Sequence, residues 1–156
     1  MSRALALAAA LVGAALMVSP AAAQQRATVD DFSVHLFMTE TGKLSPDIFK
    51  IEELGVFNAA VQGKDFEGGK FEGYVISLRF TAPGEVFAKG PQARVILRTR
   101  KGKTAKSFTV SGVYVGDSKV AYHPLFITGL DCEPVEVIVT SHGKRIAKEL
   151  PFACGE

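Results

Sequence analysis

Residues 93–115 read ARVILRTRKGKTAKSFTVSGVYV, two segments of alternating polar and apolar residues separated by Lys101-Gly102-Lys103. In the first segment Val95 and Leu97 alternate with Arg94 and Arg98. A period of two is typical of a half-buried β-strand, and a short polar turn between two such runs is typical of a hairpin. Gly112 interrupts the second segment, which predicts a bulge or a close backbone approach there.

The segments on either side of this hairpin show the same pattern. Residues 29–38 and 71–80 alternate, and residues 120–127 are a further predicted strand after the turn at Gly116-Asp117. Residues 135–140 and 145–152 form a second hairpin around Ser141-His142-Gly143-Lys144. Pro124 predicts that its strand lies at a sheet edge or bends. Short strands at regular spacing predict an all-β fold, an antiparallel β-sandwich of seven to eight strands, immunoglobulin-like or C2-like, formed by one domain over residues 24–156.

Two stretches interrupt the strand pattern. Ser45-Pro46-Asp47 supplies an N-cap and a proline at the first helical position, so we expect at most one short helix, ending near Leu54. Residues 62–69 are polar and rich in glycine, which predicts a loop. Periodicity leaves residues 56–61 open between a second strand and an extension of the helix.

Charge is distributed unevenly along a nearly neutral chain. The whole sequence carries +2 at pH 7, but residues 87–119 hold eight basic residues and one acidic residue. A ribbon of this kind attracts phosphates or carboxylates. The predicted site for an anionic partner, an unknown protein or an envelope component, consists of Arg94, Arg98, Arg100, Lys101, Lys103 and Lys106. Lysines that keep an edge strand soluble are the alternative interpretation. Nucleic acid is not expected, because no aromatic residue lies between Arg94 and Lys106 to stack on bases.

The N-terminus resembles a secretory signal peptide. Arg3 precedes a small apolar run from Ala4 to Val18, and small residues end at Ala23 before a polar Gln24. The run is shorter than the roughly 20 residues that a membrane-spanning helix needs. We therefore expect cleavage after residue 23, export to the periplasm or the medium, and no transmembrane segment in the mature chain.

The two cysteines, Cys132 and Cys154, flank the second hairpin. In an oxidising compartment the pair predicts one disulfide that joins the two ends of that hairpin. A catalytic thiol pair would instead have the Cys-x-x-Cys spacing, which the sequence lacks.

No motif for an enzyme, a cofactor or a calcium site stands out in the sequence, so we expect a non-enzymatic binding or accessory module of the cell envelope. The alternative is a small copper or zinc protein that uses His35, Met38 and His123, since imidazole and thioether groups bind such metals. Its weakness is the spacing of His35 and Met38, because strand positions three apart point to opposite faces.

Overall fold

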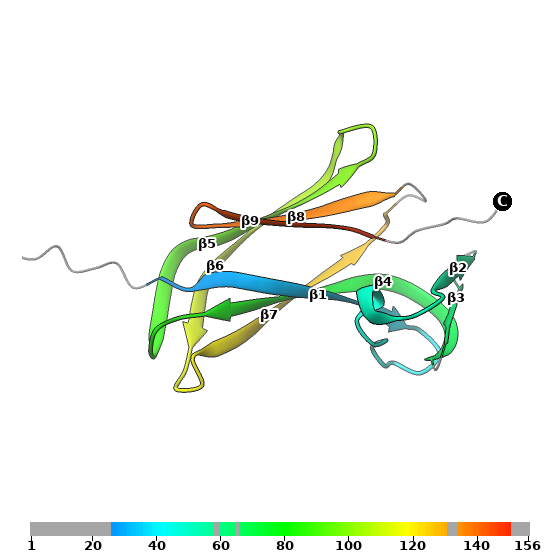
Figure 1. Cartoon of the computed structure of the whole chain (residues 1–156), viewed down its shortest axis with the longest axis horizontal. Coiled ribbons are helices and arrows are strands. Elements are labelled where there is room, and N and C mark those ends of the chain that lie inside the picture. The colour runs from blue at the N-terminus through cyan, green and yellow to red at the C-terminus, as the bar shows by residue number, and fades with distance from the viewer. Residues whose placement is uncertain (1–25, 58–59, 65, 131–133, 151–156) are drawn as a thin grey trace, which may run out of the picture.

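The computed structural model describes residues 26–57, 60–64, 66–130 and 134–150. They form nine strands and one 3-10 turn (Figure 1). In chain order the elements are β1 (Thr28–Met38), η1 (Ile48–Lys50), β2 (Gly55–Phe57), β3 (Ala60–Gly63), β4 (Phe66–Thr81), β5 (Val86–Thr99), β6 (Thr104–Val115), β7 (Val120–Thr128), β8 (Val135–Ser141) and β9 (Lys144–Glu149).

The strands form two antiparallel sheets, which confirms the predicted all-β sandwich. One sheet has the order β1-β4-β3-β2, with β7 also paired to β4, and the other has the order β6-β5-β8-β9. The first half of the long strand β4 pairs with β3, and the second half lies between β1 and β7. In Figure 1 the two sheets cross over each other, and β2 and β3 extend from one end.

Without the small β2–β3 hairpin, the strand order is that of an immunoglobulin-like sandwich. Strands β1, β4 and β7 take the places of A, B and E, and strands β5, β8 and β9 take the places of C, F and G. The remaining strand, β6, pairs with β5 rather than with β7, so it extends the second sheet instead of the first.

The core lies between the two sheets and follows the predicted alternation. In β1 the buried positions are Phe32, Val34, Leu36 and Met38, while the residues between them are partly exposed. The facing sheet buries Val95, Leu97 and Val137 completely. Burying one face of each strand is what drives the two sheets together.

Two predictions about local structure were wrong. The helix expected from Ser45 to Leu54 is only the turn η1, capped by Asp47, whose carboxylate accepts from the amide of Phe49. Ser45 is buried instead, and its hydroxyl accepts from the amide of Leu36 and donates to the carbonyl of Pro46. Tertiary hydrogen bonds to β1 therefore use the residue that was expected to cap a helix.

The second wrong prediction is the loop at residues 62–69. Gln62 and Gly63 belong to β3, and β4 begins at Phe66, so most of this stretch lies in two paired strands and not in a loop. Val61 is opposite Gly69, and a Cβ added at the neighbouring Gly68 would clash with the carbonyl oxygen of Val61, so glycine allows the close approach of the two backbones there. The described part of residues 56–61 belongs to β2 and β3 and not to a helix.

Predictions about edges and bulges hold. Strand β7, which contains Pro124, pairs only with β4 among the described strands. Gly112 has a positive φ of 68° beside a register shift between β5 and β6. The predicted leader, both cysteines and the end of the predicted second hairpin lie outside the described residues. Among the described residues, no helix is long and apolar enough to span a bilayer.

Candidate functional site

The predicted basic ribbon is divided between two faces of the four-stranded sheet. Arg94 and Arg98 lie on the outer face, because their neighbours Val95 and Leu97 fill the core. Lys106 lies on the inner face, since it is paired with Leu97 across the strands. Lys101 and Lys103 belong to the turn that projects beyond β5 and β6 (Figure 1).

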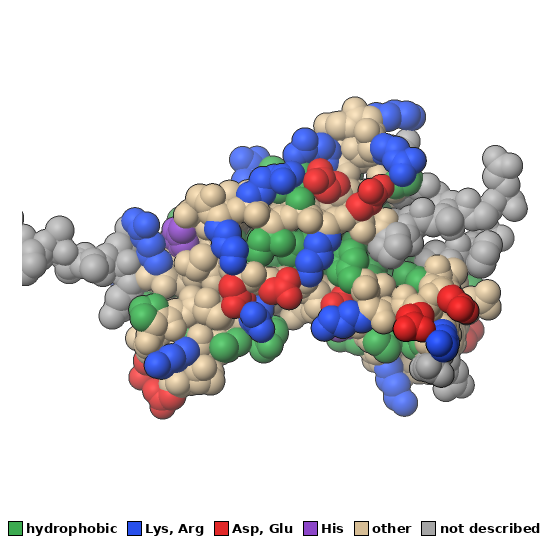
Figure 2. Space-filling model, in the orientation of Figure 1, with side chains coloured by type: hydrophobic (Ala, Val, Ile, Leu, Met, Phe, Trp, Pro, Cys, Tyr) green, Lys and Arg blue, Asp and Glu red, His purple; other side chains and the backbone are tan. Residues whose placement is uncertain are grey.

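Two of the three arginines have carboxylate partners. Arg98 lies 3.9 Å from Glu136, and Arg100 lies 3.4 Å from Glu149. Glu136 also contacts Arg145 at 3.3 Å. On the face seen in Figure 2, red carboxylates accordingly lie among the blue side chains of this sheet. These exposed pairs reduce the positive potential of the outer face.

Lysines occupy both ends of one cross-strand row on the inner face. The row runs from Lys106 in β6 through Leu97 and Val137 to Lys148 in β9. Its two central side chains are completely buried. Because β6 and β9 are the two edge strands of the sheet, each lysine can reach the edge strand of the facing sheet.

Lys148 is neutralised by β1. Its Nζ lies 2.9 Å from Oδ1 of Asp31 and also donates to the carbonyl of Phe32. The ammonium lies 4.6 Å from the centroid of the Phe32 ring, within the range of a cation–π interaction. The hydrogen bond from Lys148 lowers the pKa of Asp31 below its ordinary value of 3.8. Lys148 therefore ties the two sheets together with a paired charge.

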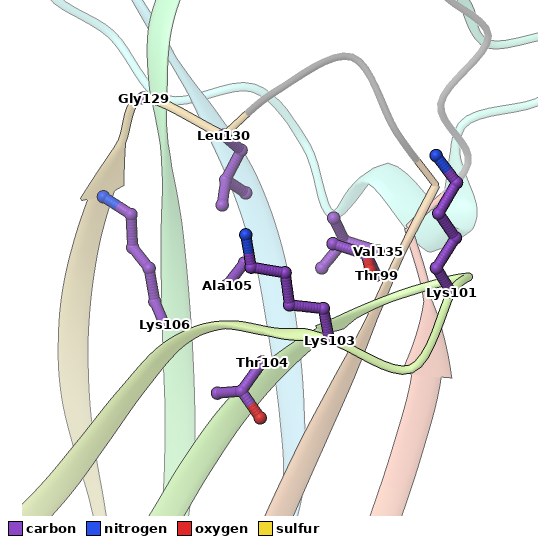
Figure 3. A pocket seen from close by; sticks show the side chains of 9 residues that line it. All are labelled: Thr99, Lys101, Lys103, Thr104, Ala105, Lys106, Gly129, Leu130 and Val135. Carbon is purple, nitrogen blue, oxygen red and sulfur yellow. The ribbon is translucent and has the colours of Figure 1, made fainter.

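Lys106 has a different environment. Its Nζ donates to the backbone carbonyl of Thr128, at the end of β7. It lines a pocket of about 430 Å³ at the end of the sandwich, which we call the lysine pocket (Figure 3). Its lining also includes Lys101, Lys103, Thr99, Thr104, Ala105, Gly129, Leu130 and Val135.

The described lining of the lysine pocket includes Lys103 and Lys106 and no carboxylate. Residues 131–133, which follow Leu130 in the chain and include Asp131 and Glu133, lie outside the described residues. Within the described part of the chain, neither Lys103 nor Lys106 forms an ion pair. Figure 3 shows their side chains running in the same direction, toward the segment that carries Gly129 and Leu130. An ammonium pair without a carboxylate attracts an anion.

A second pocket of about 380 Å³ lies on the other side of the β5–β6 turn. Its lining includes Arg98 and Arg100 together with their partners Glu136 and Glu149. The charges there compensate each other, which makes this pocket a weaker anion site than the lysine pocket.

The structure separates the metal-ligand candidates. His35 lies on the outer face of β1, where Nδ1 is 2.8 Å from the carbonyl oxygen of Ser45 and Nε2 is 2.8 Å from the hydroxyl of Ser33. Met38 is 5% exposed on the inner face of the same strand. His123 belongs to β7, opposite the core residue Leu78. The described residues contain no cluster of three or more His, Cys, Asp or Glu side chains suited to a metal ion.

One exposed group of residues was missed by the sequence interpretation. Tyr122 and Phe126 point outward from β7 and are 66% and 54% exposed. The Phe126 ring meets the Phe37 ring edge-on, with centroids 5.8 Å apart. The available signal was the spacing of Tyr122, Pro124 and Phe126, because positions two apart on a strand point to the same face. This apolar patch lies on the outer face of the first sheet.

The chain was compared with known proteins in three ways, and no family model, curated protein or solved structure matched it.

Proposed function

We propose that this chain is an exported, non-enzymatic binding module that docks an anionic component of the cell envelope through the lysine pocket. The observation that carries the proposal is the Lys103 and Lys106 pair, which faces a pocket without a carboxylate in its described lining. The export part rests on the signal-like N-terminus, and the absence of a recognisable catalytic motif supports a binding role.

The contacts also rank the six basic residues of the predicted site. Arg98 and Arg100 lie near carboxylates of their own sheet, so an anionic partner would compete with Glu136 and Glu149 for them. Lys103 and Lys106 offer no such competition within the described residues. The two lysines should therefore contribute more to binding than the two arginines.

Two double variants with the same change in net charge test this ranking. We expect K103E/K106E to elute from a sulfated or carboxylated matrix at much lower salt than the parent protein. The variant loses the contacts between the two ammonium groups and the anionic groups of the matrix, and the formation of such contacts releases counterions. R98E/R100E is the matched control and should elute closer to the parent. Equal losses in the two variants would mean that net charge, and not the lysine pocket, controls retention.

Export has a separate test. Mature protein taken from its native host should begin at Gln24, and its two cysteines should not react with a thiol reagent before reduction. An intact Met1, or two reactive thiols, would contradict the placement outside the cytosol.

A further inference from the structure

The two lysines of the inner row differ in what faces them. Lys148 meets a carboxylate supplied by β1, at 2.9 Å. At the equivalent position on the opposite edge, Lys106 meets only the backbone carbonyl of Thr128 among the described residues. A lysine ammonium has three donors, so the lysine pocket leaves donors of Lys106 available to an anion.

A second ammonium lies beside this one. Lys103 is exposed, lines the same pocket and points toward the same segment as Lys106 (Figure 3). The hydroxyl-bearing residues Thr99 and Thr104 are part of the same lining. In Figure 3 Thr104 points away from the two ammonium groups, so Lys103 and Lys106 are the groups that would hold a phosphate or carboxylate head, which carries several acceptor oxygens.

The rest of the lining is apolar. Leu130, Ala105 and Val135 lie between the lysines in Figure 3, and the methylene stems of the lysines add further apolar surface. The volume of about 430 Å³ falls within the range of small-molecule sites. A purely inorganic anion would leave this apolar surface unused.

We infer that the lysine pocket takes a small amphiphilic anion: a single phosphate or carboxylate head held by Lys103 and Lys106, with a short hydrocarbon body against Leu130. The inference rests on the proposed function, because it names the ligand class of the same site. The head could come from a phosphate ester or from a fatty acid, and the experiment separates these two sources.

The test is a titration of the full mature chain, followed by backbone amide shifts. The probes are hexyl phosphate, hexanoate, inorganic phosphate and hexanol. We expect hexyl phosphate or hexanoate to shift the amides of Leu130 and Lys106 and to bind at least about tenfold more tightly than inorganic phosphate, since burial of methylene groups favours binding. Hexanol should bind weakly, because it has no charge for the lysines. Whichever of hexyl phosphate and hexanoate binds more tightly shows whether the natural ligand carries a phosphate or a carboxylate head.

Three variants distinguish the parts of the site. Lys106→Met should weaken the binding of both hexyl phosphate and inorganic phosphate. Leu130→Ser should reduce hexyl phosphate binding to the level of inorganic phosphate. Because Leu130 also packs against the core, Ala105→Glu provides a second variant at an exposed position, and its carboxylate should displace the ligand head from the lysines.

The outcomes separate the inference from the proposed function. If hexyl phosphate and hexanoate bind no more tightly than inorganic phosphate while lysine-dependent retention persists, the amphiphilic ligand is wrong and the docking function stands. If K103E/K106E leaves retention unchanged and none of the anionic probes shifts the pocket amides, both are wrong.

Discussion

The two edges of the sandwich use the same residue type in different ways. At the β9–β1 edge, Lys148 is bound by the carboxylate of Asp31 and the carbonyl of Phe32. At the β6–β7 edge, Lys106 is bound by a backbone carbonyl and faces a pocket. An inward-pointing lysine protects an edge strand against pairing with another chain, and both lysines fit that role. Among the described residues no carboxylate pairs with Lys106, so this lysine can also serve a ligand.

The β9–β1 edge is further closed by a buried polar network at one end of β1. Ser141 accepts from the amide of Val29 at 3.1 Å and donates to the carbonyl of Gln92 at 2.7 Å. The Gln92 side chain in turn accepts from the amide of Ala27 at 3.2 Å. These bonds fix β1 to the second sheet, whereas the described contacts at the β7 end leave room for the lysine pocket.

The largest expected effect concerns the attachment of β7 to its sheet. A Cβ added at Gly73 would lie 2.6 Å from the carbonyl oxygen of Ile127 and 3.2 Å from the Phe126 ring. Gly73→Ala should therefore lower the free energy of unfolding by about 3 kcal/mol, as overpacking against backbone does. Urea unfolding measures the loss. Gly84→Ala is the control, since a Cβ there meets nothing within 4 Å. Similar stabilities for both variants would show that β7 can shift without cost.

The second prediction breaks the polar network at the β1 edge. Ser141→Ala should lower the free energy of unfolding by about 2 kcal/mol, because the buried amide of Val29 and the carbonyl of Gln92 lose the hydroxyl as a hydrogen-bond partner. Ser118 lies in an exposed turn, and Ser118→Ala should stay within about 0.5 kcal/mol of the parent. A loss at Ser141 no larger than at Ser118 would contradict a structural role for the network.

The third prediction compares the two lysines directly. Lys148→Ala should cost about 1.5 kcal/mol, because it removes charged hydrogen bonds and the contact with the Phe32 ring. Lys106→Ala should cost less than about 0.5 kcal/mol, since the carbonyl of Thr128 can bind water instead. Thermal and urea unfolding of both variants test the difference. Equal losses of unfolding free energy in the two variants would show that Lys148 and Lys106 stabilise their edges to the same extent.

The smallest expected effect is a pH dependence at the β9–β1 edge. The pKa of Asp31 is lowered in the folded chain, so its ionised form contributes stability that is present above pH 3.8 and lost as the pH falls through the folded-state pKa. The difference in unfolding free energy between the parent and Asp31→Asn should therefore shrink by less than about 1 kcal/mol between about pH 6 and pH 2.5, because the pair is partly exposed. With Lys148→Met as background, this change should become smaller, because only the amide of Phe32 and the charge of Arg79 then lower the pKa of Asp31. An undiminished change would show that Lys148 does not cause the shift.

How far the sequence predicts this site is clear from Lys103 and Lys106. Their charge and their place near a turn follow from the residue order alone. The face on which Lys106 lies depends on its register with Leu97, and register comes from the pairing of whole strands. The pocket lining adds Leu130 and Val135, which are distant in sequence from the lysines and reach them only through the fold.

The sequence by itself determined most of the strands, but not β2 and β3, because alternation over a few residues reports which face of a strand is buried. It also determined the excess of positive charge between residues 87 and 119. Only the tertiary structure decided which of those charges are compensated, since Glu136 and Glu149 come from other strands. A contact with another strand also explains why a turn replaces the helix predicted from Ser45. The hydrogen bond between Ser45 and the amide of Leu36 in β1 outweighs a weak local preference for helix.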